Sequence, residues 1–514
     1  MKKLKIKEKI SLHPVMLLLI LSLVTIVISG VLSWFNVQAT YNQMSLVTHE
    51  YQTTTEAVNS LFSLRGLKYI FTSTVSNFAN YAVLSHLIII LFGIGIMEKS
   101  GFLKTVITLL TKKAQKTTVT FVLVVVCLIS SIVGDLSYLI MIPLSALLFL
   151  YGKRNPAIGI ITAFAALTCG SGISILLTSV DSSLMNLSLI NAQVLFGNYS
   201  ISPFSFILIM FVALIILAFI ITNISENVIA KKLPKYEFGE ETLEEDLILT
   251  KKKMRGLLFA GFASFIYLIM FIYNIIPGLP FSGNLLDYSQ HLYIDKLFSF
   301  NSFFTNGFVF IVAVLFIILG LCYGIGAKTI NNNKEFIDSL SHSLNGIGKI
   351  LVMIFASATF ISIFKQTNIG SVITVGLTNL IGSSSFSGLP LLILLFFVGI
   401  IATLFLPNSI TKWTIIATSA VPVLMNVGVS PEFAQVAFRF GESVTMGLTP
   451  IFAYFVVYLA YLEKYSQEGN NFKLSKAFIY QLPYSLIVGL VLLGLIIIWY
   501  LIGLPLGIGA GVSL

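Results

Sequence analysis

Residues 15–35 read VMLLLILSLVTIVISGVLSWF, and this run decides the class of fold. About 20 consecutive apolar residues span the hydrocarbon core of a bilayer as a helix. A secretory signal peptide has a shorter apolar core, of roughly 7–15 residues, followed by a small-residue cleavage site. We therefore expect residues 15–35 to form a retained transmembrane helix, with the lysines that precede it on the cytoplasmic side.

The composition of the whole chain extends this interpretation. Of 514 residues, 57% are hydrophobic and only 10% are charged, which excludes a soluble globular protein and a disordered chain. The net charge of +10, from 31 Lys and Arg against 21 Asp and Glu, resembles that of a nucleic-acid-binding protein. Most lysines, however, lie in short clusters between apolar runs, so the excess charge indicates membrane topology.

Apolar runs recur along the chain and predict an all-α polytopic membrane protein. Placing the lysine clusters in the cytoplasm leaves the lysine-poor loops 36–76 and 277–302 outside. The three cysteines are far apart in apolar segments, which predicts plain packing. The further runs lie near 80–97, 118–134, 136–151, 157–180, 203–222, 256–276, 303–324, 346–364, 385–406, 414–429, 446–462 and 480–503.

Two of these apolar stretches are interrupted by polar residues, at 168–174 and at 406–412. An unwound helix in lipid frees backbone groups that a bound ion or substrate can satisfy. One break in each half is typical of an inverted-repeat transporter with its site near the midplane, although Gly/Pro kinks for packing are the alternative.

These observations divide the chain into six parts. The division is residues 1–76 as cytoplasmic segment, first helix and outer loop; 77–222 as a first repeat with a hairpin near 168–181; 223–255 as a charged cytoplasmic linker; 256–345 as middle helices; 346–464 as a second repeat with a hairpin near 403–413; and 465–514 as a C-terminal helix.

Ionisable residues inside apolar runs are candidates for function, because each costs several kcal/mol at the bilayer centre unless it is paired or hydrated. Asp181 follows the first break and is a candidate to carry a proton or ligate a cation. Asp135 has the same potential, but Gly134-Asp135 is equally typical of a turn. Arg439 and Glu442 share a helix face; they either neutralise one another, or Arg439 binds a substrate carboxylate while Glu442 faces an ion.

Three more residues have two interpretations each. Lys412 and Trp413 follow the second break and offer a cation and a flat ring for an aromatic substrate, but a Lys-Trp pair also serves as an interfacial anchor. His86 is either a proton relay or, more commonly for such a residue, a packed histidine.

Several separate blocks resemble the AbgT family, transporters of p-aminobenzoyl-glutamate and related antimetabolites. The resemblance covers most of the chain from about residue 59 onward. The blocks are Asn77-Phe78, residues 92–101, Ser131-Ile132-Val133-Gly134-Asp135-Leu136-Ser137-Tyr138 leading to Ile142-Pro143-Leu144, the segment ending at Asp181, Lys412-Trp413, Ser430-Pro431-Glu432, Arg439-Phe440-Gly441-Glu442-Ser443-Val444-Thr445 and Thr449-Pro450.

The resemblance implies a homodimeric carrier in a bacterial inner membrane, with about nine transmembrane helices and two re-entrant hairpins per protomer. By the same resemblance, Asp181, Trp413, Pro431 and Arg439 match positions of the substrate path. Pro431 is selected by the resemblance alone.

The chain departs from the family pattern at positions that the resemblance assigns to ion ligands. Ser174 and Thr403 stand where the family has Asn, Ile410 where Ser is usual, Glu442 where the family has Asp and Met446 where it has Asn. Hydroxyl, amide and carboxylate oxygens are ligands for a hard cation. We expect Ser174, Thr403, Asn408 and Glu442 to form a rearranged ion-coupling site, with H+ or Na+ as the coupling ion and no other cofactor or metal.

The sequence therefore predicts a secondary active transporter of small organic anions, with p-aminobenzoyl-glutamate or an antifolate as the expected substrate. The absence of a Gly-x-x-x-x-Gly-Lys-Ser/Thr motif argues against ATP-driven transport by this chain. The alternatives are an intramembrane aspartyl-type enzyme that uses Asp135 and Asp181, and an ion or anion channel. Against the enzyme, the chain lacks the Gly-x-Gly-Asp arrangement of such proteases, because Ile132 stands where the first Gly is required before Val133-Gly134-Asp135.

Overall fold

The structure, a computed structural model, describes residues 12–44, 51–175, 177–238, 249–299, 301–467 and 473–514. The chain is almost entirely helical, which confirms the all-α class. The amino-terminal lysines at positions 2–9 and the acidic residues at 240–246 of the linker lie outside the described residues.

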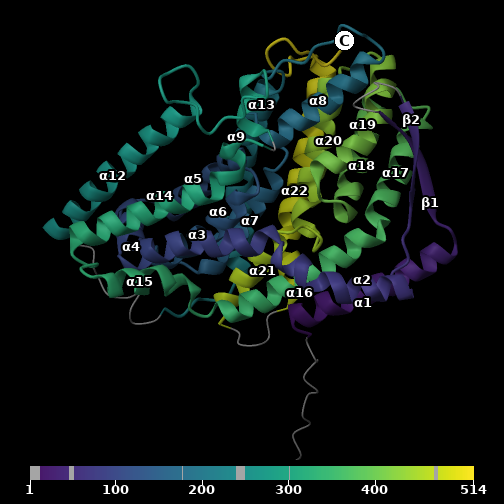
Figure 1. Cartoon of the computed structure of the whole chain (residues 1–514). Helices are drawn as coiled ribbons and strands as arrows, with labels where there is room; N and C mark the ends of the chain where they lie inside the picture. The colour runs from purple at the N-terminus through teal and green to yellow at the C-terminus, as the bar shows by residue number, and fades with distance from the viewer. Residues whose placement is uncertain (1–11, 45–50, 176, 239–248, 300, 468–472) are drawn as a thin grey trace, which may run out of the picture.

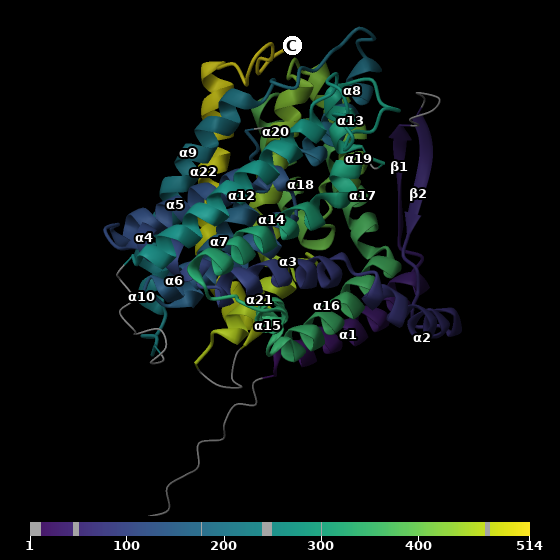
Figure 2. The ribbon, with the colours of Figure 1, turned by 60° about the vertical axis from the view of Figure 1, so that its left-hand side comes forward.

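The first part of the chain begins with α1 and a two-stranded hairpin. Strand β1 pairs antiparallel with β2, Gln38 opposite Ala57. The polar loop predicted for 36–76 thus contains a β-hairpin and most of a helix. These strands are short and polar, so they lack the alternation of apolar and polar residues by which a strand is predicted from sequence. Both views place this hairpin along one edge of the molecule and α4 toward the opposite edge (Figures 1 and 2). The elements are α1 (Pro14–Trp34), β1 (Gln38–Met44), β2 (Tyr51–Ala57), α2 (Leu64–Ala79), α3 (Ala82–Lys99) and α4 (Phe102–Thr111).

The next part holds a series of helices packed into the central core. Pro156 at the first position of α7 and the Asn155 side chain, which accepts a hydrogen bond from the Ala157 amide, begin that helix where the sequence changes from charged to apolar. The elements are α5 (Lys116–Ser130), η1 (Ser131–Val133), α6 (Leu136–Tyr151), α7 (Pro156–Cys169), α8 (Ser179–Gln193), α9 (Ile207–Ile224), the π-helical turn η2 (Ser225–Ile229) and α10 (Ala230–Lys232).

The middle of the chain contributes two long helices, α12 and α14, which pack against each other, and α14 also packs on α3 (Figure 1). A short helix lies in the loop predicted for 277–302. The elements are α12 (Lys251–Ile275), α13 (Tyr293–Phe298), α14 (Phe303–Ala327), α15 (Asn333–Ser341) and η3 (His342–Leu344).

The last part supplies the other half of the core. Helix α20 is buried along its whole length and packs closely on α18, where a Cβ on Gly441 would overlap the carbonyl oxygen of Phe396. The elements are α16 (Ile347–Thr367), α17 (Ile369–Gly382), α18 (Leu389–Phe405), α19 (Ser409–Asn426), α20 (Pro431–Thr445), η4 (Met446–Leu448), α21 (Phe455–Lys464) and α22 (Leu474–Ile502).

In the described residues, eight helical stretches are long and apolar enough to cross a membrane, and shorter apolar helices accompany them. The chain is a multi-pass membrane protein. The expected number of nine spans, the re-entrant hairpins and the six-part division stay predictions.

Besides the junction of α16 and α17 at Asn368, helices are interrupted at four places that matter for the site. Two are the breaks predicted from the sequence, between α7 and α8 and between α18 and α19. The other two are the α5–α6 connection at 131–135 and the segment 446–454 between α20 and α21. Residues from all four line one cavity, described below.

Candidate functional site

A cluster of four buried charges lies where α8, α19 and α20 meet. Arg439 is its centre: one guanidinium nitrogen lies 3.2 Å from Asp181 Oδ1, and the other is paired with Glu442 Oε1. All three side chains are buried, at 3%, 8% and 0% exposure. Pairing lowers the cost of holding charge at this depth, which explains how the chain tolerates these residues.

Lys412 completes the cluster from the first turns of α19. Its Nζ lies 3.0 Å from Glu442 Oε2 and donates a 2.6 Å hydrogen bond to the Thr403 hydroxyl at the end of α18. The Ser409 hydroxyl donates a further bond of 2.9 Å to Glu442 Oε1. Two acids and two bases thus form a formally neutral group that joins both sides of the second break.

The position of Asp181 follows from the start of α8. Thr178 caps this helix, its hydroxyl accepting from the Asp181 amide, while Asp181 Oδ2 accepts from the Thr178 amide and hydroxyl. This reciprocal capping box fixes the carboxylate on the first turn, where the helix dipole favours a negative charge. The other carboxylate oxygen, Oδ1, faces Arg439. The capping box at the start of α8 therefore positions Asp181 for its ion pair with a residue far away in the sequence.

Helix α20 presents Arg439 and Glu442 on one face because they are three residues apart. Ser430 caps the helix by accepting from the Phe433 amide, and Pro431 occupies its first position. Pro431 is therefore buried at the helix start, away from the charged cluster, and does not line the large cavity.

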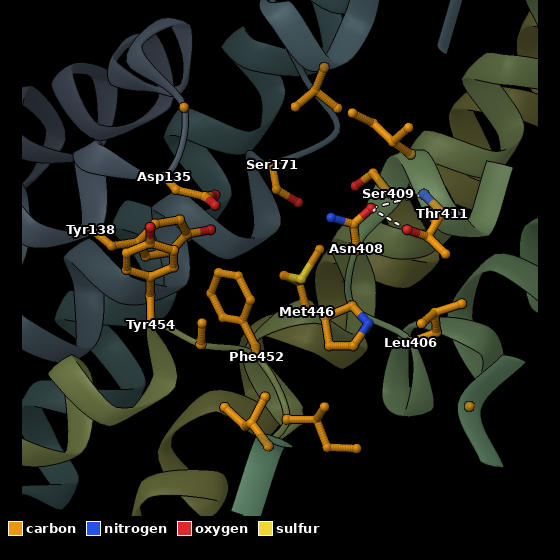
Figure 3. A pocket seen from close by; sticks show the side chains of 18 of the residues that line it. Asp135, Tyr138, Ser171, Leu406, Asn408, Ser409, Thr411, Met446, Phe452 and Tyr454 are labelled. Atoms are coloured by element: carbon orange, nitrogen blue, oxygen red, sulfur yellow. Dashed lines mark hydrogen bonds between the residues drawn. The ribbon is translucent and has the colours of Figure 1, made fainter. Parts of the chain in front are cut away.

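A cavity of about 540 Å³ lies beside this cluster. Figure 3 shows Asp135, Ser171 and Asn408, from three of the four interruptions, around the same space, with Tyr454 from the fourth. Arg439 and Lys365 line it as cations, whereas Asp135 is the sole carboxylate among the described residues that line it. Arg439 is already paired within the neutral cluster, and Lys365 and Asp135 carry opposite charges, so the described lining has no net formal charge.

Three polar atoms, two from the first break and one from α20, have no hydrogen-bond partner among the described residues: Ser171 Oγ, Ser174 Oγ and Arg439 Nε. The residues that carry them line the cavity. Buried polar groups are nearly always satisfied by protein or by a bound species, so these atoms mark where a ligand or water completes the site. Arg439 is held against this break by its 2.5 Å hydrogen bond to the Ser171 carbonyl oxygen.

Trp413 does not line the large cavity. It is fully buried, donates a 2.9 Å hydrogen bond to the Ser188 hydroxyl, and stacks on Phe438 with 4.6 Å between ring centroids. Ser188 in turn donates to Gln435 at 2.7 Å. In this conformation Trp413 ties α19 to α8 and α20, and its predicted contact with an aromatic substrate stays a prediction.

The expected ion-coupling residues are divided between the cavity and the cluster. Ser174 and Asn408 line the cavity, and Asn408 also caps α19 by accepting from the Thr411 amide at 2.8 Å. Thr403 and Glu442 are fully buried in the cluster, where they contact Lys412. In the described part of the chain, no group of three or more His, Cys, Asp or Glu side chains converges as metal ligands do.

Other cavity residues were not singled out from the sequence. Tyr138 and Tyr454 stack on one another beside Asp135, with 5.4 Å between their ring centroids. Gly447 and Pro450 signal the interruption at 446–454, but the apolar run around them hid it. His86 lies on α3, half-buried, and does not line the cavity.

The fold and this site define a multi-pass membrane protein with a cavity between broken helices that is lined by both polar and apolar residues, the class to which carriers belong. The sequence profile of the AbgT putative transporter family matches residues 5–514, and the chain belongs to that family. It is a transporter and not an enzyme, which removes the aspartyl-type alternative.

Three relatives illustrate the similarity. The p-aminobenzoyl-glutamate transport protein of Escherichia coli (strain K12) is 27% identical over 497 residues, 97% of this chain and 94% of that protein. The crystal structure of the Alcanivorax borkumensis YdaH transporter is 26% identical with a TM-score of 0.49, covering 96% of this chain and 100% of that one. Neisseria gonorrhoeae MtrF, described as illuminating a class of antimetabolite efflux pumps, is 27% identical with a TM-score of 0.48 and 98% coverage of both chains.

Proposed function

We propose that this transporter moves a small organic anion, p-aminobenzoyl-glutamate or a related antifolate or aromatic acyl-amino acid, across a bacterial inner membrane. One observation carries the proposal: Arg439, Ser171 and Ser174 line a cavity of about 540 Å³, and Arg439 Nε and both serine hydroxyls have no hydrogen-bond partner among the described residues. A charged guanidinium N–H and nearby serine hydroxyls can each donate a hydrogen bond to a carboxylate.

The aromatic part of such a substrate has a matching surface in the same cavity. Tyr138, Phe452 and Tyr454 line the cavity as an aromatic group, with Phe452 and Tyr138 packed edge to face at 5.0 Å between centroids. Stacked and edge-to-face arrangements are the contacts that aromatic rings prefer. A molecule with a carboxylate at one end and a benzoyl ring at the other would meet complementary groups at both.

Coupling to a proton or sodium gradient follows from the charge balance of the cluster. Asp181 and Glu442 already neutralise Arg439 and Lys412. A substrate carboxylate adds negative charge to a buried neutral group, which is costly. A proton on Asp181 or Glu442, or a sodium ion held by oxygens of Ser174, Thr403, Asn408 and Glu442, would remove that cost and so link anion binding to cation binding.

The proposal also includes the substrate path, the oligomeric state and the membrane orientation of the carrier. Asp181, Trp413, Pro431 and Arg439 form the substrate path, with Trp413 and Pro431 reaching the substrate in another conformation of the transport cycle. The carrier works as a homodimer with its amino terminus in the cytoplasm, and one domain moves against a dimer scaffold.

Uptake by purified protein in sealed vesicles tests the proposal. Labelled p-aminobenzoyl-glutamate is presented under an imposed proton gradient, an imposed sodium gradient, or neither. We expect saturable flux driven by one of the gradients, absent in Arg439→Ala and retained in Arg65→Ala, which changes an exposed arginine on α2. Non-saturable flux that ignores both gradients would favour a channel and contradict the proposal.

A further inference from the structure

A second cavity, of about 360 Å³, lies at the ends of α3, α4, α12 and α14, outside the charged cluster. Its wall contains five lysines. No Asp or Glu is among the described residues that line it. The set is Lys99, Lys104, Lys112, Lys252 and Lys253.

The backbone around this cavity adds to its positive potential. Helices α4 and α12 both begin at the cavity wall, which includes Gly101 before α4 and Thr250 before α12. The amino ends of helices carry partial positive charge and free amides, and anions bind there. Lys104 occupies the third position of α4, so its side-chain charge and the backbone charge of that helix start act on the same space.

Hydroxyl groups complete the polar wall. Ser100, Thr105 and Thr250 line the cavity, and Thr105 is itself buried and hydrogen-bonded to the Tyr323 hydroxyl at 2.7 Å. Lysines with hydroxyl donors in a concave site between membrane helices fit a phosphate group.

Apolar surface continues from this polar cavity along the helices. Leu109 lines the cavity and is 45% exposed, and Phe259, seven residues after Lys252 and so on the same face of α12, is 49% exposed. Further along that face Ile266 is 44% exposed. A ligand with a phosphate head and apolar tails would satisfy both parts, whereas a free phosphate would use only the first.

We propose that this cavity binds the phosphate headgroup of an anionic phospholipid, with the acyl chains lying along the exposed face of α12. The site is independent of the transported substrate. The acidic residues at 240–246, which end three residues before the cavity residue Leu249, are the alternative ligand that the test must separate from the lipid.

Native mass spectrometry of the full-length protein in detergent tests the site. The protein is mixed with phosphatidylglycerol, with phosphatidylcholine, or with inorganic phosphate alone, and the bound fraction is measured. Neutralising a lysine near an anionic headgroup weakens binding by roughly fivefold. We therefore expect Lys104→Gln/Lys252→Gln to lower retention of phosphatidylglycerol by about 25-fold, and Lys104→Arg/Lys252→Arg to retain it.

The matched control is Lys334→Gln/Lys349→Gln, which removes the same charge from exposed positions on α15 and α16. Equal retention in the control and in Lys104→Gln/Lys252→Gln would overturn the proposal. Phosphate binding with no preference for the lipid would overturn the lipid as ligand. A third variant changes the acids at 240–246 to amides. If phosphatidylglycerol retention rises in that variant but does not change in the lysine variants, the cavity is assigned to that segment and not to the lipid.

Discussion

Lys412 Nζ lies 3.0 Å from Glu442 Oε2, and neither side chain is exposed at all. The pair joins α19 to α20 directly after the second break, and the Thr403 hydroxyl accepts from the same ammonium group. Removing one member of a buried ion pair leaves an uncompensated charge, whereas removing both does not.

Lys412→Met therefore destabilises the protein by about 3–5 kcal/mol, and Lys412→Met/Glu442→Gln destabilises it by less than the sum of the single changes. Arg439 keeps Asp181 as a partner in the double variant. Thermal and chemical unfolding of the purified protein in detergent measures these differences. If the stability losses of the single changes add in the double variant, or if Lys412→Met costs no more stability than the exposed Lys349→Met, the buried pair is contradicted.

Asp181→Asn separates binding from coupling. An amide oxygen can still cap α8 by accepting from the Thr178 amide, but Arg439 loses one of its two negative partners. We expect substrate binding to persist or strengthen, because the substrate carboxylate no longer competes with Asp181, while gradient-driven accumulation falls by at least tenfold. Counterflow exchange and accumulation are measured side by side, with Asp338→Asn on the exposed face of α15 as control. Full accumulation by Asp181→Asn would remove Asp181 from the coupling machinery.

Ser171→Ala and Ser174→Ala test the unpartnered hydroxyls of the cavity. One hydrogen bond contributes about 1 kcal/mol, so each change raises the KM for substrate by roughly fivefold. Stability is unchanged or rises slightly, since each change removes a buried polar atom that has no partner among the described residues. Concentration-dependent uptake and unfolding are measured on the same preparations, with Ser85→Ala on α3 as control. A stability loss without a change in KM would make these serines structural.

Gly172 controls the approach of the first break to α20. A Cβ there would overlap the carbonyl oxygen of Arg439 and approach Ser443 Oγ, and the Gly172 amide already donates to that hydroxyl at 2.9 Å. Gly172→Ala forces the two segments apart and is expected to abolish transport and lower the yield of folded protein. Gly261→Ala on α12, where a Cβ meets nothing within 4 Å, should leave both unchanged. Normal transport by Gly172→Ala would show that this contact is not needed.

Much of the fold was predictable because its signals are local. Apolar runs predicted the helical class, and the spacing of Arg439 and Glu442 placed both on one helix face, where mutual pairing was one of two interpretations. The meeting of Arg439 with Asp181 was not predictable, since the two are far apart in the chain and only tertiary packing brings α8 to α20. Lys412 was selected as a cation, but its pairing with Glu442 needed the geometry of the second break.

The cavity itself is also a product of tertiary structure. Two of the four interruptions were visible in the sequence because hydroxyl-rich segments divide long apolar runs. The interruption at 446–454 follows an entirely buried helix, and the connection at 131–135 resembles an ordinary Gly-Asp turn. Sequence alone cannot show that such segments converge on one space, so the position of Tyr138 and Tyr454 on its wall was not predictable.

The central claim is that Arg439 binds a carboxylate of the substrate, and one binding measurement tests it directly. The affinities of p-aminobenzoyl-glutamate and of its bis-amide, in which both carboxylates are neutral, are compared by calorimetry in the unchanged protein and in Arg439→Gln. We predict that amidation weakens binding at least tenfold in the unchanged protein and by less than twofold in Arg439→Gln. An equal loss on amidation in both proteins would contradict the claim.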